Sequence, residues 1–306
     1  MTTNSSANEV TKPSRSLGGH GRNGERVEQD EHSVRHFTVH HDGVTIPVSR
    51  GGRGRPLVLC PGLNSTQADL HELTELLRHD HDVVSFDLRG HGRASAADRY
   101  SFEDFLSDLA AVMATLESLD PHSAPLLVGY SLGADLAVRY ASEHPDTLAA
   151  LVLIDGANPV PEPFITEADA AAFLAMWKDL ATQQESLRGT ARQVLLTAQE
   201  IFDLNAEIDV VRSGLLHRYR KIDRPIRMIM STSMAGDSGE EPALRLNHNW
   251  RAGVERLVRE QPHIATFWLD ADHRLAFTHA HEIAQIIRTT QDATGQADSL
   301  DRAVAD

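Results

Sequence analysis

Short apolar runs alternate with helical apolar spacings along most of this chain. Two segments, Leu70–Leu77 and Phe102–Leu119, carry apolar residues three or four positions apart, which is typical of helices that pack on a sheet. Because strands that alternate with helices form parallel sheets with helices on both faces, we expect an α/β fold with a mostly parallel central sheet. The apolar runs that read as buried strands are Pro56–Cys60, Val83–Phe86, Leu126–Val128, Leu151–Ile154, Ile226–Met230 and Thr266–Leu269.

The two ends of the chain lack this alternation. Residues 1–33 and 292–306 mix small, polar and charged residues without an apolar run, so we expect them to be flexible tails. The first predicted element is an entry hairpin of Arg35–Val39 and Val44–Val48, for which an Asp-Gly pair supplies the turn.

Between residues 158 and 224 the alternation lapses and only helical patterns remain. The segment opens with three prolines in five residues and closes just before the strand Ile226–Met230. We therefore divide the folded part into an α/β core, residues 34–157 and 225–291, and a helical insertion, residues 158–224. The helices predicted in the insertion are Ala168–Leu180, Leu187–Leu204 and Val210–Tyr219.

Composition says little about the fold but excludes some classes of function. The 306 residues are 41% hydrophobic, which is enough for one buried core with an insertion. A formal charge of −15 disfavours nucleic acids and anionic membranes as partners. No apolar stretch reaches the length of a membrane-spanning helix, and no signal-peptide run is present. A small-molecule substrate is expected, and homo-oligomer formation is left open.

The single cysteine, Cys60, excludes an internal disulfide framework and favours the cytoplasm as the compartment. Because it ends an apolar strand with no base directly after it, Cys60 is interpreted as a packed core thiol. The metal-binding patterns H-E-x-x-H, C-x-x-C and H-x-H-x-D-H are absent from the sequence. We therefore expect neither a metal nor a cofactor.

A glycine-flanked serine stands out among the loops. Gly129-Tyr-Ser131-Leu-Gly133 lies between an apolar strand and a helical pattern, which is the strand–turn–helix context in which a G-x-S-x-G match carries weight. A serine in such a turn projects its hydroxyl above the sheet, and the glycines let backbone pass where a Cβ would clash. Ser131 is the predicted nucleophile.

Together, four segments make the chain resemble the α/β-hydrolase fold superfamily, over residues 36–290. They are Pro61-Gly-Leu63, Asp87-Leu-Arg-Gly-His-Gly92, Gly129-Tyr-Ser-Leu-Gly133 and Ala271-Asp-His273. The resemblance implies that the insertion is a helical cap over the active site and that the R-G-H-G loop is mainly structural. The cap would carry the substrate pocket, with Phe164, Phe173, Met176, Trp177 and Phe202 as candidate lining residues.

A serine hydroxyl needs a base to accept its proton. His273 follows the strand Thr266–Leu269 and precedes the last predicted helix, which is where relatives present their base. His279 and His281, beside that helix, are interpreted as solvated, and His248 fits the position less well.

The third member of the triad orients the imidazole, and the resemblance leaves its identity open. Asp155 ends the strand Leu151–Ile154 and matches hydrolases that take their acid after the sixth strand. The more usual position, after the seventh strand, holds Met234; Asp237 follows three residues later and would serve only if the loop bulges. We prefer Asp155, with Asp237 as the alternative. The remaining candidates are Glu240 and Asp272.

The oxyanion formed on attack needs preorganised hydrogen-bond donors. By resemblance, these are two backbone N–H groups, that of Leu132 after the nucleophile and that of Leu63 in the loop after the third strand. Proline at position 61, where relatives usually carry histidine, removes only an N–H that the oxyanion hole does not use.

These roles predict a serine hydrolase that cleaves a carboxylic ester or lactone through an acyl-enzyme. Because a fold does not settle chemistry, thioester, C–C or amide cleavage and cofactor-free haloperoxidase or lyase reactions remain alternatives. A non-catalytic ligand receptor on the same scaffold is a further alternative, from a different class of protein.

Overall fold

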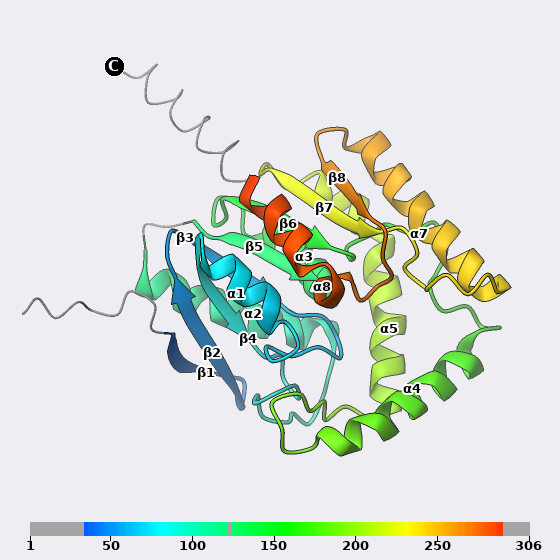
Figure 1. The fold of residues 1–306 in the computed structure, drawn as a ribbon, viewed down its shortest axis with the longest axis horizontal. Coiled ribbons are helices and arrows are strands. Elements are labelled where there is room, and N and C mark those ends of the chain that lie inside the picture. The colour runs from blue at the N-terminus through cyan, green and yellow to red at the C-terminus, as the bar shows by residue number, and fades with distance from the viewer. Residues whose placement is uncertain (1–33, 122–123, 290–306) are drawn as a thin grey trace, which may run out of the picture. The chain divides into compact units, whose positions relative to one another are not determined.

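The computed structural model describes residues 34–121 and 124–289, which build one eight-stranded sheet (Figure 1). Its strand order is β1-β2-β4-β3-β5-β6-β7-β8. Both predicted tails lie outside the described residues. The strands are β1 Arg35–His41, β2 Val44–Gly52, β3 Arg55–Cys60, β4 His81–Phe86, β5 Leu126–Tyr130, β6 Ala150–Ile154, β7 Ile226–Ser231 and β8 Ala265–Leu269.

Strand direction divides this sheet into two parts. β1 pairs with β2, and β2 with β4, in antiparallel register. Every other pairing, from β4 through β3 to β8, is parallel. The predictions of an entry hairpin and of a mostly parallel α/β sheet are confirmed.

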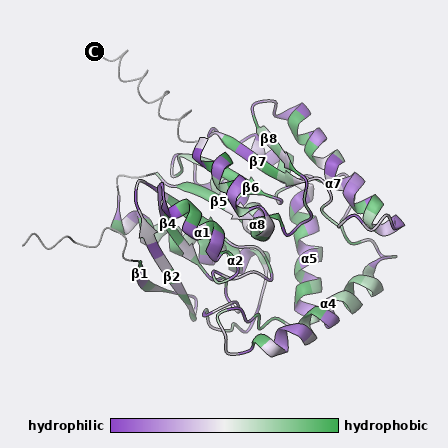
Figure 2. Cartoon of the chain, in the orientation of Figure 1, coloured by the Kyte–Doolittle hydropathy of each residue, from purple (hydrophilic) through white to green (hydrophobic). Residues whose placement is uncertain are grey.

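Alternate residues of the central strands face opposite sides of the sheet. In β3, Val58 and Cys60 join a larger apolar cluster, whereas Leu57 and Leu59 join a smaller one. Because both faces are buried, these strands read as continuous apolar runs, and Figure 2 shows hydrophobic residues along them. The larger cluster includes residues of α2 Phe102–Leu119, α3 Leu132–Glu143 and α7 Glu241–Glu260; the smaller includes residues of α1 His71–Arg78, α8 Leu275–Thr278 and the helix at 280–289.

Helix α7 was not predicted from the sequence. Its buried apolar residues recur at helical spacing, and Pro242 stands in its first turn, where proline is tolerated. The signal was therefore present in the sequence. The residues that carry it are Ala243, Leu246, Trp250, Val254 and Leu257.

The helices between β6 and β7 differ in how they pack. No residue of α4 is buried, whereas α5 and α6 contribute Leu204 and Tyr219 to the larger cluster. In Figure 1, α4 lies at the outer end of this segment, beside α5. The helices are α4 Ala170–Gln184, η1 Glu185–Leu187, α5 Ala198–Ser213 and α6 Leu215–Tyr219.

The predicted helix Leu187–Leu204 is wrong in its first half, because α5 begins only at Ala198. The Thr197 hydroxyl accepts the N–H of Glu200, and the Glu200 carboxylate accepts the N–H of Thr197. This capping box starts the helix, and its T-x-x-E pattern was readable from the sequence.

The residues ahead of α5 pair with the core instead of forming a helix. The N–H of Gly92 donates to the carbonyl of Gln193 at 2.8 Å, and the N–H of Leu195 donates to the carbonyl of Gly90 at 2.8 Å. These backbone bonds to the R-G-H-G loop hold the segment non-helical. Such a contact joins residues about a hundred positions apart, so local patterning does not report it.

Candidate active site

Ser131 occupies the sharp turn between β5 and α3. Its backbone has φ 53° and ψ −119°, a conformation that is strained for any residue with a Cβ. The turn is held by the Ser131 N–H, which donates to the carbonyl of Ile154 at 2.9 Å. A Cβ at Gly133 would lie 2.3 Å from the carbonyl oxygen of Cys60, so only glycine lets the helix approach β3 this closely. The result is a half-buried serine beyond the carboxyl end of the sheet.

His273, in the loop after β8, contacts this serine. Its Nε2 lies 2.9 Å from Ser131 Oγ, and its side chain is 37% exposed. The loop is fixed on both sides, because the His273 N–H donates to the carbonyl of Met234 at 3.2 Å and the Tyr130 hydroxyl donates to the carbonyl of His273 at 2.7 Å. Met234, where relatives usually carry the acid, thus contributes its backbone to the placement of the histidine.

Asp155, in the turn after β6, completes the arrangement. Its Oδ2 lies 2.8 Å from His273 Nδ1, and its side chain is fully buried. A carboxylate can only accept hydrogen bonds, so Nδ1 carries the proton and Nε2 presents a lone pair. Ser131 Oγ therefore donates to Nε2, which is the arrangement that a general base requires.

Two further residues, neither of them predicted from the sequence, hold Asp155. The Ser231 N–H and hydroxyl donate to Oδ1 at 2.9 Å each, and the hydroxyl lies 2.8 Å from Oδ2. The indole Nε1 of Trp250, from α7, donates to Oδ1 at 3.0 Å. These donors stabilise a buried carboxylate that would otherwise be costly. The contact of Trp250 with Asp155 could not be predicted because α7 had not been predicted.

The other candidate acids lie elsewhere. Asp237, Glu240 and Asp272 are exposed, and none of them bonds to His273 within the part of the chain that the structure describes. Asp272 instead accepts the backbone N–H of Arg274 at 2.8 Å. The geometry brings Ser131, His273 and Asp155 together and leaves these three acids out.

Comparison with known proteins agrees with this architecture. A family model described as alpha/beta hydrolase fold matches residues 55–200. The crystal structure of E-2-(acetamidomethylene)succinate hydrolase superposes with a TM-score of 0.61 at 20% identity, covering 85% of this chain and 100% of that one. The chain belongs to the α/β-hydrolase fold superfamily.

Two curated relatives have different names within this superfamily. N-formylmaleamate deformylase of Pseudomonas putida is 29% identical over 61% of this chain and 73% of its own length. A non-heme haloperoxidase of Rhodococcus erythropolis is 32% identical over 40% of this chain and 44% of its own length. The chain spans less than half the length of several curated relatives that it matches.

The two predicted oxyanion-hole donors flank Ser131 in this α/β-hydrolase. Leu132 is the first residue of α3, where a backbone N–H has no partner within the helix. Leu63 follows Gly62, which approaches Ser131 so closely that a Cβ there would lie 2.8 Å from Ser131 Cβ. The N–H of Leu63 donates to no other described residue. Neither N–H group therefore has a hydrogen-bond acceptor among the described residues, and both lie near Ser131.

Cys60 is fully buried at the end of β3, and burial raises the pKa of its thiol. This agrees with its interpretation as a packed core residue. Among the described residues, no group of three or more His, Cys, Asp or Glu side chains could hold a metal ion. None of the described helices is long and apolar enough to cross a membrane.

The candidate pocket residues of the insertion are only partly buried. Phe164 and Phe173 contact each other with ring centroids 5.5 Å apart, and both pack against the larger cluster together with Trp177. Phe202 is half-buried, and Met176 is exposed. Their contact with substrate stays a prediction.

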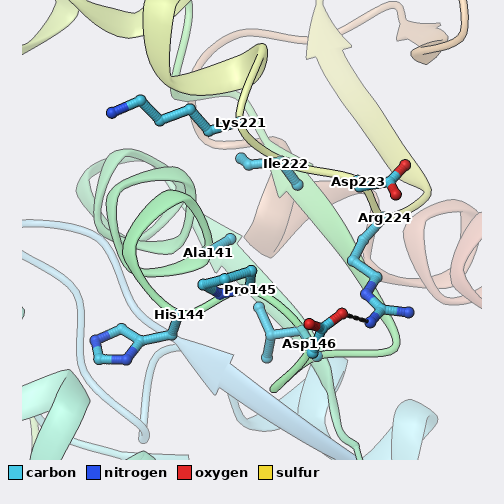
Figure 3. Close-up of a pocket in the computed structure, with 9 residues that line it drawn as sticks. Ala141, His144, Pro145, Asp146, Lys221, Ile222, Asp223 and Arg224 are labelled. Atoms are coloured by element: carbon cyan, nitrogen blue, oxygen red, sulfur yellow. Dashed lines mark hydrogen bonds and ion pairs between the residues drawn. The ribbon is translucent and has the colours of Figure 1, made fainter.

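A small pocket elsewhere lies away from this chemistry. It is formed at the end of α3 and in the segment that leads into β7, and the side chains of Asp146 and Arg224 form an ion pair beside it (Figure 3). These residues precede β6 and β7, whereas Asp155 follows β6. The pocket therefore lies at the amino ends of the strands, opposite the candidate active site.

Proposed function

We propose that this α/β-hydrolase is a serine hydrolase that cleaves a carboxylic ester or lactone of a small molecule. The observation that carries the proposal is the hydrogen-bonded series from Ser131 Oγ to His273 Nε2, at 2.9 Å, and from His273 Nδ1 to Asp155 Oδ2, at 2.8 Å. A serine, a base and an orienting acid linked in this order form the arrangement that activates a hydroxyl for acyl transfer.

The proposed reaction has two halves. Ser131 Oγ attacks the substrate carbonyl while His273 Nε2 takes its proton, and the oxyanion accepts hydrogen bonds from the backbone N–H groups of Leu63 and Leu132. The intermediate collapses to an acyl-enzyme as His273 returns the proton to the leaving alcohol. A water molecule, deprotonated by the same imidazole, then attacks the acyl carbon. The bond to Ser131 Oγ breaks, the acid is released, and the imidazolium returns the proton to Oγ. Asp155 orients the imidazole and stabilises the imidazolium.

The helical insertion is proposed to act as the cap that shapes the substrate pocket. The half-buried aromatic residues Phe164, Phe173, Trp177 and Phe202 supply apolar surface there. Every residue of α4 stays at least partly exposed, so the helix keeps surface that a substrate could contact.

A second candidate function is hydrolysis of an N-acyl bond. N-formylmaleamate deformylase, by its name, acts on an N-formyl compound, and E-2-(acetamidomethylene)succinate hydrolase on an acetamido compound. The same three side chains would serve, with His273 protonating a nitrogen instead of an oxygen.

The test compares wild type with Ser131→Ala on p-nitrophenyl acetate, a panel of lactones and a panel of N-formyl and N-acetyl compounds. We expect wild-type turnover that falls at least about 1,000-fold in Ser131→Ala, with unchanged circular dichroism. Higher kcat/KM for the N-acyl panel would favour the second candidate.

A fluorophosphonate probe separates a hydrolase from a receptor. An activated Ser131 reacts rapidly with the probe, whereas a decayed site does not. A folded wild type that neither turns over any substrate nor takes up the probe would contradict the proposal. Peroxide-dependent halogenation that exceeds hydrolysis would place the chemistry with haloperoxidases instead.

A further inference from the structure

The loop after β3 is a tight turn whose geometry bears on Leu63. The carbonyl of Gly62 accepts two hydrogen bonds from Ser65, from the N–H at 3.2 Å and from the hydroxyl at 2.8 Å. In a trans peptide the C=O and the following N–H point in opposite directions. The two bonds from Ser65, which is 2% exposed, therefore set the direction of the Leu63 N–H.

The turn has one specific form. Asn64 has φ 63°, and Leu63 does not appear among the described residues with positive φ. A bonded four-residue turn with positive φ only at its third residue is type II, and asparagine is one of the few residues that tolerates this position. Type II differs from the commoner type I in the orientation of the central peptide, between Leu63 and Asn64. A hydrogen-bond partner of the Leu63–Asn64 peptide would favour the type II orientation.

The buried imidazole of His91 interacts with that peptide. The Asn64 N–H donates to His91 Nε2 at 3.3 Å, while His91 Nδ1 lies 2.9 Å from the carbonyl of Arg89. A carbonyl can only accept, so Nδ1 carries the proton and Nε2 is free to accept. Burial lowers the pKa of His91 to about 4, which keeps the ring neutral and Nε2 an acceptor near pH 7.

The R-G-H-G loop is rigid enough to act as an anchor. Arg89 makes a buried bidentate pair with Asp108 of α2, at 2.7 and 2.8 Å. The His91 ring packs edge-on against Phe105 of the same helix, with centroids 6.2 Å apart. On its other side the loop pairs with Gln193 and Leu195. The imidazole thus has a fixed position from which to hold Asn64.

We propose that His91 and Ser65 are positioning residues: Ser65 sets the direction of the Gly62–Leu63 peptide, and His91 anchors the adjoining Leu63–Asn64 peptide, so that the 62–65 turn keeps the Leu63 N–H aimed at the oxyanion. This rests on the proposed serine hydrolase function. His91 does not touch the substrate: it acts through the Asn64 peptide, and Ser65 acts through the Gly62 carbonyl. The R-G-H-G loop, interpreted from the sequence as mainly structural, thereby acquires a role in the reaction.

The test is the variant His91→Phe, which keeps an aromatic ring of similar size and removes the acceptor. The ester kinetics are measured together with inhibition by phenylboronic acid, whose Ser131 adduct places an oxygen in the oxyanion hole. We expect kcat to fall about 10- to 100-fold with KM within about twofold, and the affinity for phenylboronic acid to fall in parallel. His91→Gln, whose side-chain carbonyl can accept a hydrogen bond, should restore part of both.

His81→Phe is the matched control. His81 is equally buried, at the start of β4, and makes no hydrogen bond to the 62–65 turn. It should keep wild-type kcat and affinity for phenylboronic acid, even if its stability changes. A merely structural role for His91 would lower the melting temperature without the parallel loss of kcat and boronate affinity.

The outcomes separate this inference from the proposed function. A folded His91→Phe with wild-type kcat and boronate affinity overturns the inference while Ser131-dependent turnover still stands. If His91→Phe does not fold, Ser65→Ala decides: a parallel loss supports the inference, and wild-type values overturn it. A wild type without turnover, probe labelling or phenylboronic acid binding overturns both proposals.

Discussion

The loops at the carboxyl ends of the strands and the helical segment between β6 and β7 are built in opposite ways. In the loops, Asp155 is fully buried and accepts hydrogen bonds from Ser231, Trp250 and His273. In the insertion, α4 buries no residue at all and leaves Met176 exposed. The loops therefore hold their side chains in one geometry, whereas the contacts of α4, chiefly with α5, leave every one of its residues at least partly exposed.

This difference matches the roles proposed for the two regions, which are the reaction in the loops and substrate selection in the insertion. Reacting groups gain from a fixed geometry, because an error of about an ångström in their placement is costly. A surface that selects substrates tolerates more variation. One buried ion pair joins the two regions: Arg212 of α5 binds Asp135 of α3, with Nη2 to Oδ2 at 2.8 Å. The Arg212 guanidinium also lies 5.5 Å from the centre of the Trp250 ring.

The largest expected effect lies in the loops. Asp155→Asn should lower kcat about 1,000- to 10,000-fold with the fold intact, because an amide can donate to His273 Nδ1 and so favour the wrong tautomer. Asp237→Asn is the matched control and should change kcat less than about twofold, since Asp237 is exposed and makes no described bond to His273. Steady-state ester kinetics measure both. Equal effects of the two substitutions would contradict the assignment of the acid.

Breaking the Arg212–Asp135 ion pair should give the next largest effect, on the free energy of unfolding. Arg212→Met leaves the Asp135 carboxylate buried without its partner and should lower the free energy of unfolding by about 3–5 kcal/mol. Adding Asp135→Leu should recover part of the loss. Arg188→Met, which removes an exposed pair with Glu185 in the insertion, should cost less than about 1 kcal/mol. Urea denaturation compares them, and equal losses for Arg212→Met and Arg188→Met would refute the role of the buried pair.

The buried histidine of the R-G-H-G loop gives a pH-dependent prediction. The pKa of His91 is lowered to about 4 by burial, against an ordinary value of 6.5. Between these values the unfolded chain binds a proton that the folded chain does not. The free energy of unfolding is therefore highest, as far as His91 is concerned, above pH 6.5. It decreases as the pH falls, and the decrease reaches about 3 kcal/mol at pH 4. The free energy of unfolding should fall less steeply with acidification in His91→Phe; equal slopes would contradict this.

A small effect on stability is expected in α4. Phe173→Ala removes a half-buried ring that contacts Phe164, so the free energy of unfolding should change by only about 1 kcal/mol. If the insertion selects substrates, KM should rise several-fold while kcat stays near wild type. The measurement is the ratio of kcat/KM across the ester panel. A hundredfold loss of kcat would instead show that α4 positions the reacting groups.

The turn that holds Ser131 could be predicted from the sequence because its constraint is local. Gly129 and Gly133 are the residues that a close strand–helix approach requires, so the motif by itself predicts the backbone geometry of the turn. The start of α5, which Thr197 caps, depends on an equally local pattern, the T-x-x-E capping box. By contrast, the pairing of Leu195 with Gly90 depends on chain contacts that no local pattern encodes.

By itself, the sequence determined the alternation of strands and helices, the strained serine turn and the late histidine, because apolar periodicity and glycine requirements act over a few residues. Only the tertiary structure decided which carboxylate meets His273. Asp155 and Asp237 both follow strands, and their difference lies in distance and burial, which depend on how β6, β7 and α7 pack. The same holds for Ser231, Trp250 and His91, whose hydrogen bonds join segments far apart in the chain.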